Sequence, residues 1–272
     1  MVVACSKWFH MKFVDAHVHL SDEEYAGCIE EVMAEAKNSN VVALVSNSMD
    51  FKTSIDSLRL AEKYPGTVYV ALGIHPWSLN TLPEEEIQQT LELISKQRQD
   101  KAFVAIGEIG LDSKYMKIWD KQMKVFDSML HLAENLELPV IIHSRGATTQ
   151  IVDILPSYKL KKILLHWFSN PIGALSKALK IGCYVSEGAP TIYSNCIRDV
   201  VKRVPLTNLL TETDGPVRFF KPPFYGKRRT PSIIPTVVKA IAEIKVANAG
   251  EVAEQIIKNF ESFFGVKLDS TN

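Results

Sequence analysis

Residues 103–143 read FVAIGEIGLDSKYMKIWDKQMKVFDSMLHLAENLELPVIIH, with two short apolar runs on either side of a longer helical segment. The runs at residues 103–108 and 139–143 have the length and composition of buried strands. Between them, apolar residues recur along one side of the expected helix: Ile118, Met123, Phe126, Met129, Leu130 and Ala133. A strand–helix–strand unit of this kind predicts two parallel strands joined by a helix.

The same alternation continues along most of the chain. Strands are expected at residues 13–17, 41–47, 68–75, 103–108, 139–143, 162–168, 183–187 and 209–214. Helices are expected between them, for example at residues 22–37, 83–99, 117–136 and 171–181. Eight strands alternating with helices in about 250 residues predict an α/β fold, a (β/α)8 TIM barrel. An open doubly wound sheet is the alternative, but the Gly-rich turn of its dinucleotide-binding form is missing after the first strand.

Composition and charge narrow the class of protein. The chain has 31 Lys and Arg against 31 Asp and Glu, which excludes a strongly basic nucleic-acid coat and a polybasic membrane anchor. No apolar run approaches the roughly 18 residues that cross a bilayer. Four scattered cysteines without a CxxC pair indicate reduced thiols and a cytoplasmic protein. We expect a single domain over residues 11–272, after an extension at residues 1–10 that fits a misplaced start codon better than a targeting signal.

Side chains able to bind a metal ion stand at the ends of most expected strands. They are His17, His19, Glu108, His143, His166 and Asp214. His17 and His19 share one face of their strand because alternate residues point the same way. The carboxyl ends of parallel strands meet at one rim of a barrel, where barrel enzymes have their active sites. One such residue alone is more often a hydrogen-bonded or solvated side chain, but six at one rim favour a metal centre.

The donor types limit the identity and number of the metal ions. Imidazole combined with carboxylate suits Zn²⁺, Mn²⁺, Fe²⁺ or Co²⁺ better than Mg²⁺. Six ligands exceed the need of one catalytic ion that must keep an open position. Two divalent ions that share one bridging carboxylate therefore fit the pattern.

The motifs that contain these residues resemble those of the TatD family of metal-dependent deoxyribonucleases, within the wider group of amidohydrolase-like barrels. The matching motifs are FVDAHVHL (13–20), GIHP (73–76), GEIGLD (107–112), PVIIHSR (139–145), HWFS (166–169) and ETDGP (212–216). GKR (226–228) and NF (259–260) also match, so the resemblance runs from residue 13 to about residue 265. A lone HxH pair is weak evidence, whereas this ordered series along nearly the whole chain is strong.

The resemblance implies a dinuclear centre with zinc, manganese or magnesium, the last being the family's usual description. It divides the six side chains between two sites: His17, His19 and Asp214 at one metal, His143 and His166 at the other, and Glu108 as the catalytic bridge. A carboxylated lysine bridges the metals in many proteins of the wider group, so a glutamate at this position disfavours a dihydroorotase or urease. The chain departs from the family at Ser21, Thr149 and Asn170, which affects contacts at the rim and leaves the ligands intact.

Four further roles follow from the positions of polar residues. Asp214 is expected to accept a proton, as general base, from a metal-activated water that attacks a phosphodiester. Arg145, two residues after a ligand histidine, is placed for a bidentate phosphate contact, with a rim salt bridge as the alternative. His75 could donate to the phosphate or to the leaving group, or be a structural histidine. Glu212 shares strand parity with Asp214 and is expected to orient a ligand histidine.

Residues 216–231 are rich in proline, aromatic and basic residues and are expected to form a long loop after the last strand. The basic and aromatic side chains are Lys221, Lys227, Arg228, Arg229, Phe219, Phe220, Phe224 and Tyr225. They could guide a single strand of nucleic acid to the rim. The simpler interpretation is a solvated basic turn with aromatic rings packed beneath it.

The leading hypothesis is a metal-dependent deoxyribonuclease, an exonuclease that removes nucleotides from the end of DNA. A net charge of zero favours single-stranded DNA or DNA ends over long duplex, and neither a membrane nor an obligate protein partner is expected. The alternative is a hydrolase of another ester or amide, such as a D-aminoacyl-tRNA deacylase, because the same centre polarises carbonyls. A third possibility is a barrel that has lost catalysis and serves as a binding module. The six intact ligand positions argue against it.

Overall fold

The computed structural model describes residues 11–169, 171–219, 221–222 and 224–268, so the expected extension at residues 1–10 lies outside the described residues. Within them, eight strands form one sheet in which each strand pairs in parallel with the next along the chain. Their bounds are β1 Phe13–Val18, β2 Val41–Asn47, β3 Val68–Leu72, β4 Phe103–Gly110, β5 Val140–His143, β6 Ile163–His166, β7 Tyr184–Glu187 and β8 Leu209–Thr211.

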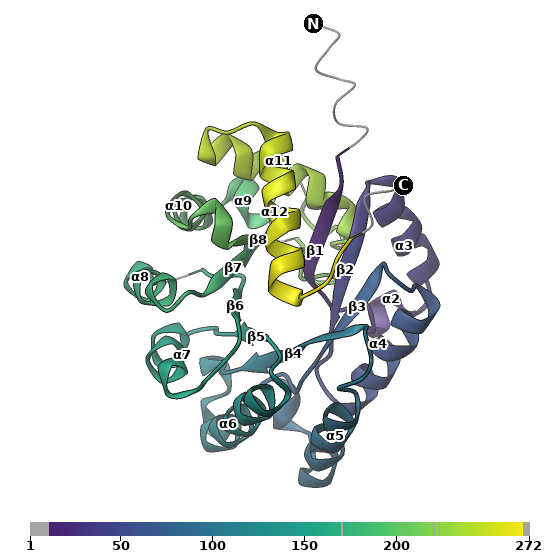
Figure 1. Cartoon of the computed structure of the whole chain (residues 1–272), viewed down its shortest axis with the longest axis vertical. Helices are drawn as coiled ribbons and strands as arrows, with labels where there is room; N and C mark the ends of the chain where they lie inside the picture. Colours follow the sequence, from purple (N-terminus) through teal and green to yellow (C-terminus); the bar gives the residue numbers. More distant parts are fainter. Residues whose placement is uncertain (1–10, 170, 220, 223, 269–272) are drawn as a thin grey trace, which may run out of the picture.

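The first and last strands lie side by side and complete the barrel (Figure 1). The Thr211 hydroxyl donates to the Val14 carbonyl at 2.6 Å, and the Asp214 N–H donates to the His17 carbonyl at 2.9 Å. These bonds connect β8 and the residues after it to β1. The prediction of a (β/α)8 barrel is therefore confirmed.

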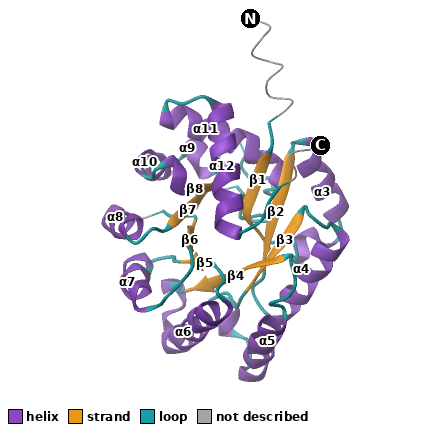
Figure 2. Cartoon of the chain, in the orientation of Figure 1, coloured by secondary structure: helices purple, strands orange, loops and turns teal. Residues whose placement is uncertain are grey.

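Helices follow the strands and surround the barrel (Figures 1 and 2). In the described part of the chain they are α2 Glu23–Ala26, α3 Ile29–Asn38, α4 Phe51–Lys63, α5 Glu84–Lys96, α6 Trp119–Leu136, α7 Thr148–Ile154, α8 Ile172–Lys180, α9 Pro190–Tyr193, α10 Asn195–Arg203, α11 Ile234–Lys245 and α12 Ala249–Phe264. Short 3-10 turns lie at η2 Ser78–Asn80, η3 Ser113–Ile118, η4 Leu155–Ser157, η5 Leu206–Asn208 and η6 Pro231–Ile233. None of these helices is both long enough and apolar enough to cross a membrane.

Several predicted elements have different bounds in the structure, and three of these differences affect the site or its surroundings. The single helix expected at residues 22–37 is divided into α2 and α3. Strands β3 and β8 end earlier than expected, so His75 and Asp214 lie in the loops beyond them. Asp214 has a φ of 52°, a left-handed backbone conformation that cannot continue a strand. Gly73 ends β3 in a close approach to β4, where an added Cβ would lie 2.8 Å from the Glu108 carbonyl oxygen.

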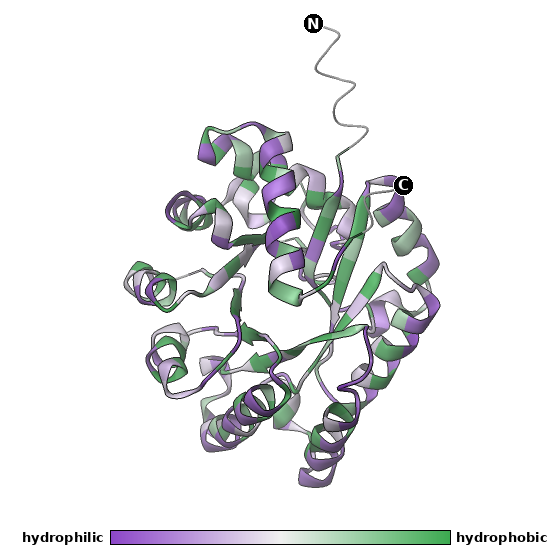
Figure 3. Ribbon diagram, viewed as in Figure 1, coloured by the Kyte–Doolittle hydropathy of each residue, from purple (hydrophilic) through white to green (hydrophobic). Residues whose placement is uncertain are grey.

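The helices bury their apolar faces against the outside of the barrel. In α6, the predicted face packs inward through Phe126, Met129 and Leu130, while Met123 at its edge is only partly buried. All residues of β4 are buried, as expected for a strand covered on both faces. Figure 3 shows the same arrangement as hydrophobic strands surrounded by helices with many hydrophilic residues.

Helix α12 lies across the amino-terminal end of the barrel. Its Phe260 ring is 6.4 Å from Tyr69, near the start of β3, and its Phe263 ring is 5.1 Å from Tyr184, at the start of β7. Because β3 and β7 stand on opposite sides of the barrel, one helix can contact both only by crossing its mouth (Figure 1). This end is therefore filled by aromatic side chains, and the carboxyl end is left for a functional site.

Candidate metal centre

The six predicted ligands converge at the carboxyl end of the barrel, and all six are buried. They come from five strands or the residues directly after them: His17 and His19 from β1, Glu108 from β4, His143 from β5, His166 from β6 and Asp214 from the loop after β8. Chain positions up to 197 residues apart are thereby brought to one place. The parallel arrangement of the strands accounts for this convergence, because their carboxyl ends share one rim.

Glu108 lies between two groups of histidines. Its Oε2 atom is 3.3 Å from His17 Nε2 and 3.2 Å from His19 Nε2. Its Oε1 atom is 2.9 Å from His143 Nδ1 and 2.8 Å from His166 Nε2. Each carboxylate oxygen therefore faces a different pair of imidazoles, which is the arrangement that a carboxylate bridging two ions requires.

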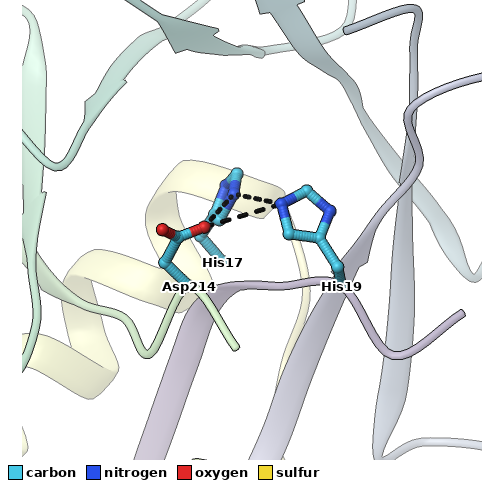
Figure 4. Close-up of side chains that lie close together, drawn as sticks. All are labelled: His17, His19 and Asp214. Atoms are coloured by element: carbon cyan, nitrogen blue, oxygen red, sulfur yellow. Dashed lines mark hydrogen bonds and ion pairs between the residues drawn. The ribbon is translucent and has the colours of Figure 1, made fainter. Parts of the chain in front are cut away.

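Asp214 completes the group around the first pair of histidines (Figure 4). Its Oδ1 atom is 3.5 Å from the Nε2 atoms of both His17 and His19, and these two nitrogens are 3.3 Å apart. The three donor atoms lie within 4.8 Å of one another, as do those of His17, Glu108 and His166. Three such atoms can be ligands of one ion without rearrangement of the backbone.

The donor set fits divalent metal ions. Glu108 Oε2 and His17 Nδ1 are buried and have no hydrogen-bond partner among the described residues. Burial raises the pKa of Glu108, but its neighbours His75, His166 and His17 outweigh burial and hold that pKa well below its usual range. Conversely, the Glu108 charge overcomes the effect of burial on His166 and raises its pKa well above the usual value. The centre thus favours positive charge, which a divalent ion supplies when it displaces the protons.

His75 points into the same centre, with its Nε2 atom 3.2 Å from Glu108 Oε1. Its Nδ1 atom accepts the Trp77 backbone N–H at 3.1 Å, so the Nε2 atom of the neutral ring carries the proton. Burial lowers the pKa of His75 to about 4. A neutral ring with this tautomer is a hydrogen-bond donor at Nε2, which suits the predicted contact to substrate.

Asp112 belongs to the centre, although its role was not predicted from the sequence. Its Oδ2 atom is 3.1 Å from His143 Nε2 and accepts the Trp77 indole N–H at 2.5 Å. Burial opposes the shift, but the hydrogen bonds from His143 and Trp77 lower the pKa of Asp112 to about 2. Asp112 therefore orients His143 so that Nδ1 faces Glu108. The available signal was its place in the GEIGLD motif, four residues after Glu108.

Other contacts position the ligands of the first group. His19 Nδ1 lies 2.9 Å from the Asn47 carbonyl oxygen, to which it donates, and in the neutral ring this leaves Nε2 as the unprotonated nitrogen. Asp15 accepts the Thr213 hydroxyl at 2.6 Å, the Thr213 N–H at 3.1 Å and the His17 N–H at 3.2 Å. Asp15 was also missed by the sequence analysis, and it joins β1 to the residues that precede Asp214.

The structure places the remaining predicted residues in different surroundings. Arg145 is exposed at the rim, and its side chain forms no ion pair within the part of the chain that the structure describes, so the alternative of a rim salt bridge is not seen. Glu212 is buried with Oε2 at 3.7 Å from His166 Nδ1, too far for a hydrogen bond. Glu212 instead accepts the Ser186 hydroxyl at 2.5 Å.

The basic and aromatic side chains of the loop at residues 216–231 differ in how far they are buried. Lys221, Lys227 and Tyr225 are exposed, Phe219 is buried against Phe224, and Phe220 lies outside the described residues. Arg228 is partly buried, and its Nη1 atom donates to the Glu24 carbonyl at 2.6 Å.

Arg229 is the exception in this loop, because it is 1% exposed. Its Nη1 atom lies 3.9 Å from Asp214 Oδ2, and its guanidinium lies over the rings of Trp167 and Phe219. The expectation of a wholly solvated basic surface was therefore wrong for this residue. The Asp214 charge and the two aromatic faces explain why it is buried.

The fold and the centre together define a class of protein, the (β/α)8-barrel hydrolases with a histidine and carboxylate metal site at the carboxyl rim. The family model described as TatD related DNase matches residues 14–265, and the chain belongs to this family of metal-dependent hydrolases.

Similar proteins cover almost the whole chain. The metal-dependent hydrolase YabD of Bacillus subtilis (strain 168) is 34% identical over 262 residues, which span 93% of this chain and 98% of YabD. Deoxyribonuclease TATDN3 of Homo sapiens is 31% identical over 264 residues, spanning 92% and 94% of the two chains. The crystal structure of the TatD homologue YJJV from Escherichia coli K12 matches with a TM-score of 0.87 at 28% identity, covering 94% of this chain and 98% of the other.

Proposed function

We propose that this protein is a deoxyribonuclease that hydrolyses phosphodiester bonds with two divalent metal ions. The observation that carries the proposal is the position of Glu108, whose two carboxylate oxygens face two separate pairs of histidines. The relationship to TATDN3, which is named a deoxyribonuclease, supports DNA as the substrate.

The assignment of ligands follows the two groups of side chains. His17, His19 and Asp214 would hold one ion and His143 and His166 the other, with Glu108 placed between the two groups to serve both. Four imidazoles favour Zn²⁺ or Mn²⁺, with Mg²⁺ the further candidate. When bound, two such ions can activate a water, hold a phosphoryl oxygen and stabilise the leaving oxygen.

The protein side chains then orient the substrate and move the proton. Asp214 accepts the proton of the attacking water, since its carboxylate is buried beside the first group. His75 donates from Nε2 to a phosphoryl oxygen or to the leaving oxygen. Arg145 reaches the phosphate from the rim, because it is exposed and two residues beyond His143. Glu212 supports the β7 and β8 side of the centre by accepting the hydroxyl of Ser186, which lies on β7.

The substrate we propose is a single strand or a DNA end. A balanced net charge favours a short or single-stranded substrate over long duplex DNA. Removal of nucleotides from an end requires one phosphodiester at the centre at a time. The scattered cysteines keep the cytoplasm as the proposed location.

The test is metal content after purification, combined with hydrolysis of end-labelled single-stranded DNA in Mg²⁺, Mn²⁺ or Zn²⁺. We expect metal-dependent shortening that a chelator abolishes and that His143→Ala lowers by about 100-fold or more. The matched control is His131→Ala, since His131 is a 60% exposed histidine on α6, away from the rim. Bound metal without DNA cleavage would contradict the nuclease and favour another ester, such as a D-aminoacyl-tRNA.

A further inference from the structure

An open cavity of about 300 Å³ lies beyond the ends of β6 and β7, and its lining includes Trp167, the residue after the proposed ligand His166. Its lining is mostly apolar and includes Trp167, Pro190, Tyr193, Ile197 and the charged Lys221. The volume is at the lower end of the range for small-molecule sites. None of the six proposed ligands comes from β7, so this sector of the rim has space for a part of the substrate other than the phosphate.

The cavity is directly connected to the proposed ligands on both sides. Trp167 follows the ligand His166, and it contacts Arg229, whose guanidinium carbon is 4.6 Å from the Trp167 ring centre. Arg229 Nη1 is in turn 3.9 Å from Asp214 Oδ2. A molecule in the cavity that touches Trp167 is therefore separated from Asp214 by two side chains only.

Trp167 is held in a fixed orientation before any substrate binds. Its backbone has a φ of 40°, a left-handed conformation that persists only where the surroundings impose it. Arg229 lies over its ring, and Phe219 contacts the same guanidinium at 5.2 Å. A rigid aromatic ring loses little conformational entropy on binding, which makes it an effective stacking surface.

We propose that this cavity binds the nucleobase adjacent to the scissile phosphate, stacked against Trp167 and Tyr193. This inference rests on the proposed nuclease function and identifies the part of the substrate that the centre positions. Every nucleobase has an aromatic face, so stacking of this kind holds a nucleotide without selecting its sequence. The Lys221 ammonium in the lining matches the charge of the neighbouring phosphate.

The experiment compares esters that share the scissile bond and the leaving group and differ in the base. Thymidine 5′-(4-nitrophenyl phosphate) and its 3′ isomer carry a base, whereas methyl 4-nitrophenyl phosphate carries none. We expect the metal-loaded protein to prefer one of the thymidine esters over the methyl ester by about 10-fold or more in kcat/KM. Trp167→Ala and Tyr193→Ala should each reduce that ratio several-fold, and Trp167→Phe should restore most of it.

Two controls distinguish base binding from a general defect. Tyr193 is not adjacent to a ligand, so Tyr193→Ala tests the cavity even if Trp167→Ala loses metal. Tyr158→Ala removes an aromatic side chain before β6, at the opposite end of the barrel, and should retain the wild-type ratio. An unchanged ratio in both cavity variants, or an equal loss on all three esters, would overturn the inference and leave the nuclease intact.

Failure of the proposed function itself has a different signature. If the metal-loaded protein hydrolyses none of these esters, cleavage of end-labelled DNA decides whether the nuclease is wrong, and binding of 2-aminopurine deoxyribonucleoside monophosphate tests the cavity alone. Fluorescence quenching on the wild-type protein that is lost in Trp167→Ala and Tyr193→Ala supports the cavity. Absence of quenching on the wild-type protein overturns it.

Discussion

At the scale of single residues, Glu108 has the largest number of contacts in the centre. It is a buried carboxylate with histidines on both oxygens, and a buried charge of this kind is stable only when it is paired. The imidazoles stabilise the negative charge of Glu108, and that charge in turn attracts the imidazoles on both sides. Removal of that charge should therefore affect both groups of ligands at once.

We predict that Glu108→Gln reduces bound metal to one ion or fewer per chain and lowers phosphodiester turnover by about 100-fold or more. The amide keeps the shape of the side chain but removes the charge that would bridge the two ions. Metal per chain is measured by mass spectrometry of the digested protein, and turnover with end-labelled DNA.

The matched control for this change is Glu92→Gln on α5, where the glutamate is 63% exposed and far from the rim. It should retain both metal and turnover. If Glu108→Gln behaves like Glu92→Gln, the bridging role of Glu108 is wrong.

The convergence of residues on strands could be predicted from the sequence, whereas the surroundings of residues in loops could not. His17, Glu108, His143 and His166 stand on strands, so their convergence followed from a parallel barrel. The loop residue Arg229 was assigned to a solvated surface, and its burial depends on Trp167 and Asp214, which meet it only in the folded chain. The pairing of Asp112 with His143 could not be predicted either, because the periodicity of a strand does not determine where a carboxylate in the following loop lies.

At the scale of elements, the two ends of the barrel have different roles, one occupied by α12 and the other by the loops that follow the strands. Helix α12 fills the amino-terminal mouth with Phe260 and Phe263. Its Asn259 side chain donates to the carbonyls of Leu206 and Leu209, each at 2.7 Å, and so attaches the helix to β8. This end supports the fold, and the loops at the other end form the centre.

We predict that Phe260→Ala lowers the free energy of unfolding by about 3–5 kcal/mol, because it removes a fully buried ring and leaves a cavity. The kcat/KM of the folded variant should stay within about 2-fold of wild type at low temperature, since the change is at the end opposite to the centre. Urea denaturation and initial rates measure the two effects.

The control on the same helix is Lys258→Ala, an exposed position where the change in unfolding free energy should be within about 0.5 kcal/mol. A large loss of kcat/KM in folded Phe260→Ala would show that the amino-terminal end influences the centre. A small effect on stability would show that the ring does not fill the barrel mouth.

At the scale of the whole molecule, the centre connects distant parts of the barrel. Strands β1, β4, β5 and β6 and the loop after β8 all supply side chains to it, so the proposed ions would bind to the folded chain only. Metal binding and global stability should therefore be linked.

We predict that chelation lowers the Tm of the wild-type protein by about 5 °C or more relative to protein with metal at 100-fold its Kd. The histidines must be unprotonated to bind the ions, so this stabilisation is present at neutral pH and is lost as the pH falls and protons compete. Differential scanning fluorimetry with and without chelator, from pH 8 to pH 5, measures the difference.

His143→Ala is the comparison for this prediction, because it removes one proposed ligand and should reduce the shift that chelation causes. His131→Ala should retain the full shift. Equal shifts in the three proteins would indicate that the stabilising metal binds elsewhere.

The sequence by itself determined the barrel and the identity of the six proposed ligands. Both depend on patterns of short range, namely the alternation of apolar runs with helical segments and the position of polar residues at strand ends. The tertiary structure alone decided how these residues are paired: which oxygen of Glu108 faces which histidines, that Asp112 orients His143, and that Arg229 lies buried between Asp214 and Trp167. These contacts join loops far apart in the chain, and their distances follow from the closure of the barrel, which no local pattern specifies.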